Sequence, residues 1–90
     1  MQSSRSEGMI EYPCDFPIKI MGIAHGDFLS TVAELVQKHD SFFDAKTIEM
    51  RTSSKGNYLS ITAVIRATSQ DQLDNLYMAL TLHPMVKIVL

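Results

Sequence analysis

Apolar and polar residues alternate along four stretches of the chain, with the period of two that is typical of strands with one buried face. The stretches are 16–23, 47–52, 58–67 and 85–90. In the third, Leu59, Ile61 and Ala63 share one face. In the last, Val86, Ile88 and Leu90 share one phase. The pattern therefore predicts four strands, each with one apolar face.

Two other stretches repeat apolar residues at helical spacing. The first runs from Phe28 to His39, and Asp27 is a good N-cap for it. The second opens with a capping box at 69–72, carries Leu73, Leu76, Tyr77 and Leu80 on one face, and is stopped by Pro84.

The predicted order is strand, helix, strand, strand, helix, strand. Short connections and right-handed crossovers turn this order into an α+β, ferredoxin-like βαββαβ sandwich. Its four-stranded antiparallel sheet has the first and third strands in the centre, and both helices cover one face. Residues 1–11 are predicted to be a flexible tail, and residues 12–90 a single domain.

Composition narrows the class of protein. Eight Lys and Arg residues against ten Asp and Glu residues give a net charge of −2, whereas a nucleic-acid binder usually carries a basic excess. The single cysteine, Cys14, fits a reducing compartment. No signal-peptide segment and no membrane span are predicted, so the expected location is the cytoplasm. The spacing of the three His residues and Cys14 predicts no metal site, and no cofactor is expected.

With both helices on one side, the other face of the sheet is open. Strand phase places Lys19, Glu49, Arg51, Arg66 and Lys87 on it, four basic residues and one acid. The outer helix positions are mostly acidic, with Asp27, Glu34, Asp71 and Asp74 against Lys38. The chain is thus expected to have a basic sheet face and an acidic helix face, unless these are only solvated surface charges.

An apolar stripe is predicted across this open face. Met21, Val64 and Val89, beside Lys19, would form an interface. Either a partner or the N-terminal segment, through Met9, Ile10 and Tyr12, would cover it.

The first strand–helix loop is a candidate ligand site. Gly22, His25, Gly26 and Asp27 lie where open sheets often place ligands. His25 and Asp27 could form an acid–base pair, although a turn at Gly26 and a helix cap at Asp27 explain the same residues.

The predicted hairpin loop is a second candidate. Ser53, Ser54, Lys55, Gly56 and Asn57 offer hydroxyls, an ammonium group and backbone amides that could hold an anion. The segment lacks P-loop spacing, and its Gly and Asn also suit a plain turn.

Several segments resemble the YbeD-like family of small bacterial proteins of unknown function. They are 19–24, 36–39, the segment 53–58 (Ser-Ser-Lys-Gly-Asn-Tyr) and 86–90. The resemblance implies a ferredoxin-like fold similar to ACT regulatory domains, which bind small metabolites and associate with one another. It carries over no catalytic residue.

These observations favour a non-enzymatic regulatory or interaction module that forms a homo-oligomer, most simply a dimer. Its ligand would be an amino-acid-like metabolite with its amino group near Asp27 and its carboxylate at the loop amides, or else a protein partner. Two alternatives stay open. One is a small enzyme that uses His25, Asp27 and the Lys55 loop. The other is a weak nucleic-acid binder that uses Lys19, Arg51, Arg66 and Lys87. The positions assigned to the open face of the central strands include no aromatic residue to stack bases: they are Lys19, Met21, Ser60, Thr62 and Val64.

Overall fold

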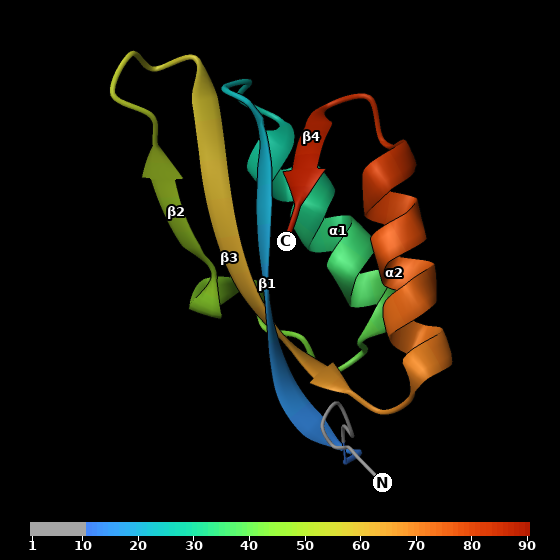
Figure 1. The fold of residues 1–90 in the computed structure, drawn as a ribbon. Helices are drawn as coiled ribbons and strands as arrows, with labels where there is room; N and C mark the ends of the chain where they lie inside the picture. The colour runs from blue at the N-terminus through green and yellow to red at the C-terminus, as the bar shows by residue number, and fades with distance from the viewer. Residues whose placement is uncertain (1–10) are drawn as a thin grey trace, which may run out of the picture.

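In the computed structural model, which describes residues 11–90, the elements follow one another in the predicted order (Figure 1). They are β1 (Cys14–Ile23), α1 (Phe28–His39), a short 3₁₀ turn (Ala45–Thr47), β2 (Glu49–Thr52), β3 (Tyr58–Ala67), α2 (Gln70–Leu82) and β4 (Val86–Val89). The predicted tail, 1–11, lies outside the described residues except for Glu11. The ferredoxin-like βαββαβ fold is confirmed.

The sheet is antiparallel and has the order β2-β3-β1-β4, as predicted. β1 and β3 pair without interruption from Cys14 opposite Ala67 to Ile23 opposite Tyr58. β2 and β4 are much shorter and pair only with the half of this ribbon nearer the loops (Figure 1).

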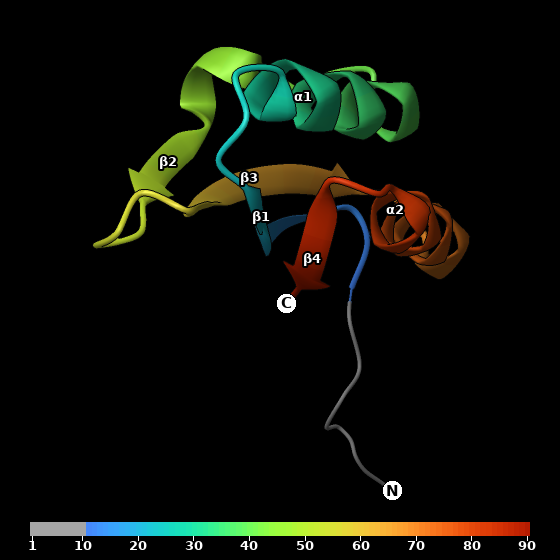
Figure 2. The same cartoon turned by 90° about the horizontal axis from the view of Figure 1, so that it is seen from above.

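The core lies between the sheet and the two helices. Figure 2 shows α1 above the strands and α2 next to β4. The completely buried residues of this core include Ile18, Ile20, Ile61 and Ile65 from the strands, and Phe28, Val32, Val36, Leu76 and Leu80 from the helices. Tyr77 packs against this cluster, and its partial burial raises the pKa of its phenol above the usual 10.0. None of the helices in 11–90 is both long and apolar enough to cross a bilayer.

β4 departs from the predicted phase. Ile20 stands opposite Val89 and Met21 opposite Ile88, but Gly22 stands opposite Val86, so Lys87 is an extra residue in a β-bulge. The bulge moves Val89 to the core side, where it packs against the buried cluster, and leaves Ile88 48% exposed. The prediction that Ile88 points inward and Val89 outward was therefore wrong.

β2 is shorter than the predicted strand. It begins at Glu49, because Asp44 accepts a hydrogen bond from the Lys46 amide and starts the 3₁₀ turn that contains Thr47. Met50, on the apolar side of the alternating stretch 47–52, is 47% exposed on this edge strand.

The two helix starts differ from each other. At α1, the Asp27 side chain makes no capping hydrogen bond, so its predicted role was wrong; the first turn is held through the backbone carbonyl of His25, which accepts from the Phe28 amide. At α2, Ser69 Oγ accepts from the Gln72 amide as the capping box predicts.

Gln72 also joins three segments at one end of the molecule. Its Oε1 accepts from the amide of Thr68, while its Nε2 donates to the carbonyls of His39 and Arg66. We call this end, where α1 and β3 finish and α2 begins, the closed end. The opposite end, where the β1–α1 loop and the β2–β3 hairpin meet, is the loop end.

Candidate ligand-binding face

The open face of the sheet carries two rows of side chains that cross the strands. In the first row, Ile88 on β4 stands opposite Met21, which stands opposite Ser60, which stands opposite Arg51 on β2. In the second row, Leu90 forms two backbone hydrogen bonds with Lys19, which stands opposite Thr62, which stands opposite Glu49. Each row is therefore apolar at the β4 edge and charged at the β2 edge.

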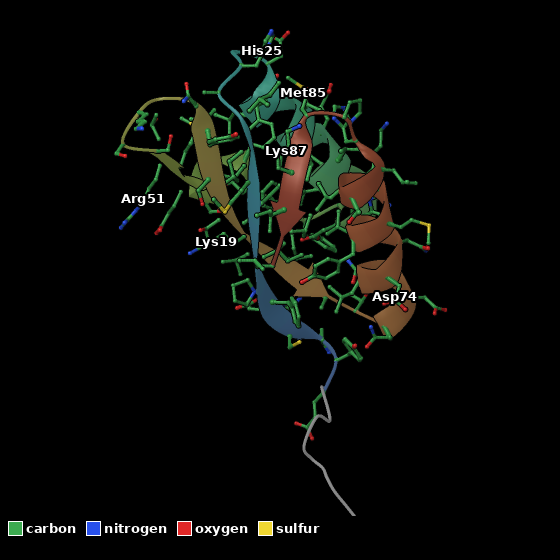
Figure 3. All side chains as sticks on the ribbon, turned by 45° about the horizontal axis from the view of Figure 1, so that its top comes forward. Lys19, His25, Arg51, Asp74, Met85 and Lys87 are labelled. Atoms are coloured by element: carbon green, nitrogen blue, oxygen red, sulfur yellow. The ribbon has the colours of Figure 1, made fainter. Side chains whose placement is uncertain are left out.

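The charged halves of these rows line a shallow polar hollow. Lys19, Glu49 and Arg51 are exposed around it, and the half-buried hydroxyls of Ser60 and Thr62 form its floor. Within residues 11–90, no ion pair joins these three charged groups, so none is neutralised by close contact there. Figure 3 shows Lys19 and Arg51 projecting on the same side of the sheet. The hollow offers two cations, one carboxylate and two hydroxyls within a small area.

The apolar half of the first row, Met21 and Ile88, lines a neighbouring apolar hollow. Tyr58 and Lys87 complete its walls. Tyr58 is 49% exposed here. The sequence prediction missed Ile88, because a bulge cannot be read from alternation, and it passed over Tyr58. The two hollows adjoin where Met21 stands opposite Ser60.

The predicted apolar stripe of Met21, Val64 and Val89 does not form. Met21 is paired with Ser60 and Val64 with Pro17, so the two residues lie four positions apart along β3. Val89 faces the core. Of this interface, Lys19 and Met21 remain together on the open face.

The predicted covering segment is only partly described. Met9 and Ile10 lie outside the described residues. The hydroxyl of Tyr12 donates to Gln70 Oε1, 3.2 Å away, which places Tyr12 at the start of α2.

The β1–α1 loop has few free donors. The amides of Ile23, Ala24 and His25 donate to the carbonyls of Met85, Asn57 and Ile23, respectively. The Asp27 amide donates to His25 Nδ1, and the Phe28 amide donates to the His25 carbonyl. Of the amides from Ile23 to Phe28, only that of Gly26 has no partner within the described part of the chain. The loop therefore offers an anion less than the sequence suggests.

Gly22, another predicted ligand residue, is buried and serves close packing. A Cβ at this position would collide with the Met85 carbonyl and with the Phe28 ring. Gly26 has open space around its Cα.

His25 and Asp27 form only a loose pair. Their Nδ1 and Oδ2 atoms are 4.0 Å apart, and both side chains are mostly exposed. His25 lies at the tip of the loop end (Figure 3). His25 Nδ1 accepts a hydrogen bond from the Asp27 amide, and neither side chain lines the polar or the apolar hollow.

The hairpin loop is built as a turn. Ser53 Oγ accepts from the Tyr58 amide, the Gly56 amide donates to the Ser53 carbonyl, and Gly56 has a φ of 76°. The Asn57 carbonyl accepts from Ala24, so the two predicted loops lie side by side. Ser54 and Lys55 remain exposed to solvent.

The four basic residues predicted on the open face do not form one cluster. Lys19 and Arg51 flank the polar hollow, and Lys87 borders the apolar one. Arg66 lies near the closed end, opposite Asp15 in the β1–β3 register. No group of three metal-ligating side chains gathers anywhere in residues 11–90.

Comparison with known proteins finds relatives along nearly the whole chain. A family model described as "Protein of unknown function (DUF493)" matches residues 7–90. A UPF0250 protein of Janthinobacterium sp. (strain Marseille) is 59% identical over 94% of this chain and 93% of its own length. The UPF0250 protein RSc0326 of Ralstonia nicotianae is 58% identical over 93% of this chain and 87% of its own length.

A solved structure supports the fold. The solution structure of protein HP0495 from H. pylori aligns with a TM-score of 0.78 at 20% sequence identity, covering 100% of this chain and 94% of that one. At this identity the likeness concerns the fold alone.

Proposed function

We propose that this chain, which belongs to the DUF493 family of proteins of unknown function, is a non-catalytic binding module that takes an amino-acid-like metabolite on the open face of its sheet. The observation that carries the proposal is the pair of adjoining hollows, one polar and one apolar, on the face of the sheet that no helix within residues 11–90 covers.

The chemistry of the polar hollow fits a zwitterion. A ligand carboxylate would lie between Lys19 and Arg51, since Arg and Lys form strong charge-assisted hydrogen bonds with carboxylates. A ligand ammonium group would face Glu49. The hydroxyls of Ser60 and Thr62 can donate or accept beneath it.

The apolar hollow determines in which direction the side chain of a bound ligand would extend. Met21 and Ile88 continue the row that contains Ser60, so a ligand side chain can extend from the polar hollow over them. Apolar area with a few placed polar groups is the usual composition of a small-molecule site. The preferred ligand is thus an amino acid with an aliphatic side chain.

The geometry of His25 and Asp27 favours a binding role over catalysis. His25 and Asp27 are exposed and 4.0 Å apart, while catalytic bases act from hydrogen-bond distance. The nucleic-acid alternative receives less support, because Tyr58 is the one aromatic side chain among the described residues that line the two hollows, and Arg66 lies apart from the other basic residues.

A regulatory role in the cytoplasm, exercised by a homodimer, forms part of the proposal. The outer edges of β2 and β4 carry no strand in the described chain, and unpaired edges favour association. Sedimentation velocity at two concentrations tests the dimer, and a monomer at both would contradict it.

The binding proposal is tested by NMR titration of the full chain with a panel of single amino acids and simple carboxylic acids. Aliphatic amino acids should shift the amides of Lys19, Ser60 and Arg51, and should raise the melting temperature by mass action. Shifts confined to 22–27 or to 53–57 would move the site to one of the loops.

The variants Lys19→Ala and Arg51→Ala should each weaken binding by about tenfold or more, the effect of losing a hydrogen bond to a charged group. Lys38→Ala, which removes an exposed lysine from α1, is the matched control and should bind like the wild type. Equal binding by all three variants, or the absence of shifts with every compound, would overturn the proposal of a metabolite ligand and favour a protein partner.

A further inference from the structure

Phe42 is the most exposed large apolar side chain in residues 11–90, at 85% of its surface. It follows α1 in the segment that leads to β2, and it has a buried neighbour, Phe43, which is only 6% exposed. Phe42 stands in the turn that follows α1, and the burial of Phe43 beside it leaves the Phe42 side chain in water.

Hydrogen bonds to Asp40 hold the backbone at Phe42. Asp40 is 4% exposed, and its Oδ1 accepts from the Phe42 amide at 3.0 Å. The Phe43 amide donates to the Asp40 carbonyl, also at 3.0 Å. Phe42 is therefore an aromatic side chain held outward on an ordered turn, which lowers the entropy that a contact with it would cost.

A hollow lies beside Phe42 on the closed-end half of the open face. Val64, 44% exposed, forms its apolar wall together with Phe42. The edge of β3 is also open here, because β2 begins only at Glu49, opposite Thr62, and no strand within residues 11–90 pairs with 63–67 on that side. Both backbone groups of Arg66 already have partners: its amide donates to Asp40 Oδ2 at 2.9 Å, and its carbonyl accepts from Gln72 Nε2 at 3.1 Å.

The charges around this hollow are mainly negative. Asp15, Asp40 and Asp44 line it, against the single cation Arg66. Both oxygens of Asp40 accept from backbone amides, and Asp44 accepts from the Lys46 amide, but amides do not cancel a carboxylate charge. A complementary surface would be apolar and basic.

We propose that this corner, formed by Phe42, Val64, Asp15 and Asp44, docks another protein through an extended segment that carries Lys or Arg next to an aliphatic residue. The aliphatic side chain lies between Phe42 and Val64, and the basic group faces Asp15 and Asp44. The segment lies along the edge of β3 at residues 63–65, between the end of the β2 pairing and Arg66, in the manner of strand addition.

Charge argues against a second copy of this chain as the occupant. Two copies joined through the same corner would bring their Asp15 and Asp44 carboxylates together, which is unfavourable. The corner is also separate from the polar hollow, which is lined by other residues, so the proposal stands independently of the metabolite proposed above.

The test is selection of peptides from a random displayed library on the full-length protein, followed by affinity measurement with synthetic copies of those recovered. The recovered peptides should combine Lys or Arg with Leu, Ile or Val. Phe42→Ser should weaken their binding by about tenfold or more, as expected for an aromatic residue that dominates a contact. Asp44→Asn keeps the turn acceptor but removes the charge, and should weaken binding less and reduce its salt dependence.

Leu82→Ser is the matched control, since Leu82 is 76% exposed on α2, and this variant should bind like the wild type. Melting curves verify that each variant is folded. Acidic peptides, peptides that bind Phe42→Ser equally well, or no recovered peptide at all would overturn the proposal. A wild-type dimer that Phe42→Ser dissociates would also overturn it and assign the corner to a second copy.

Discussion

At the closed end, side chains hold the elements together, whereas at the loop end the contacts are between backbone groups. Asp40 and Gln72 together accept from or donate to five backbone groups on the segments that meet at the closed end. At the loop end, Ala24 donates to the Asn57 carbonyl and Ile23 to the Met85 carbonyl. Substitution should therefore be costly at particular side chains of the closed end. At the loop end it should matter only where the backbones approach most closely.

The largest effect should come from the one position of the loop end where no side chain fits. Gly22→Ala should lower the free energy of unfolding by about 3 kcal/mol, since overpacking against a carbonyl and a buried ring costs about 1–3 kcal/mol. Gly26→Ala, with open space around it, should change the stability by less than about 0.5 kcal/mol. Urea denaturation of both variants measures the difference, and equal stabilities would refute the close packing of Gly22 beneath Phe28.

The next effect concerns two aspartates with similar local hydrogen bonds but different burial. Asp40→Ala should cost about 2 kcal/mol, because it leaves the Arg66 and Phe42 amides without their charged acceptor. Asp44→Ala removes an exposed acceptor of the Lys46 amide and should cost about 0.5–1 kcal/mol. If thermal melts give the two variants the same loss, burial of Asp40 does not matter to the closed end.

The smallest effect separates two glutamines on α2. Gln72→Ala should cost about 1 kcal/mol, the typical net contribution of hydrogen bonds that tie segments together. Gln70 makes its side-chain hydrogen bonds at the surface, to Tyr12 and Asp74, so Gln70→Ala should be close to neutral. Hydrogen exchange adds a local readout: the Thr68 amide should exchange faster in the first variant only.

Most of the fold could be predicted from the sequence, because local signals agree with one another. Alternation gave the bounds of β3 correctly, and the capping box gave the start of α2. The error in β4 lies where a distant contact decides. The bulge at Lys87 depends on how β4 meets β1, which alternation within β4 cannot show.

The candidate site was less predictable for the same reason. Lys19 and Met21 could be assigned to the open face from β1 alone, but their neighbours Ser60 and Ile88 follow from the registers with β3 and β4. Phe42 had no signal of this kind, because it stands in a turn, and alternation assigns side chains to faces only in strands. That Phe42 is exposed and Phe43 buried follows from the fold, in which the Asp40 side chain bonds to the Phe42 amide and to β3.

The unbroken β1–β3 ribbon has a consequence for how the chain folds. Its pairs join residues that are distant in sequence, from Ile23 with Tyr58 to Cys14 with Ala67, whereas the β2–β3 hairpin joins Thr52 with Leu59. The hairpin can close within microseconds, but the ribbon must first close a loop that contains α1 and β2. We expect the hairpin to form first and the arrival of β1 to set the folding rate. β1, which pairs with both β3 and β4, is thus the first of the four strands to be synthesised and among the last to join the sheet.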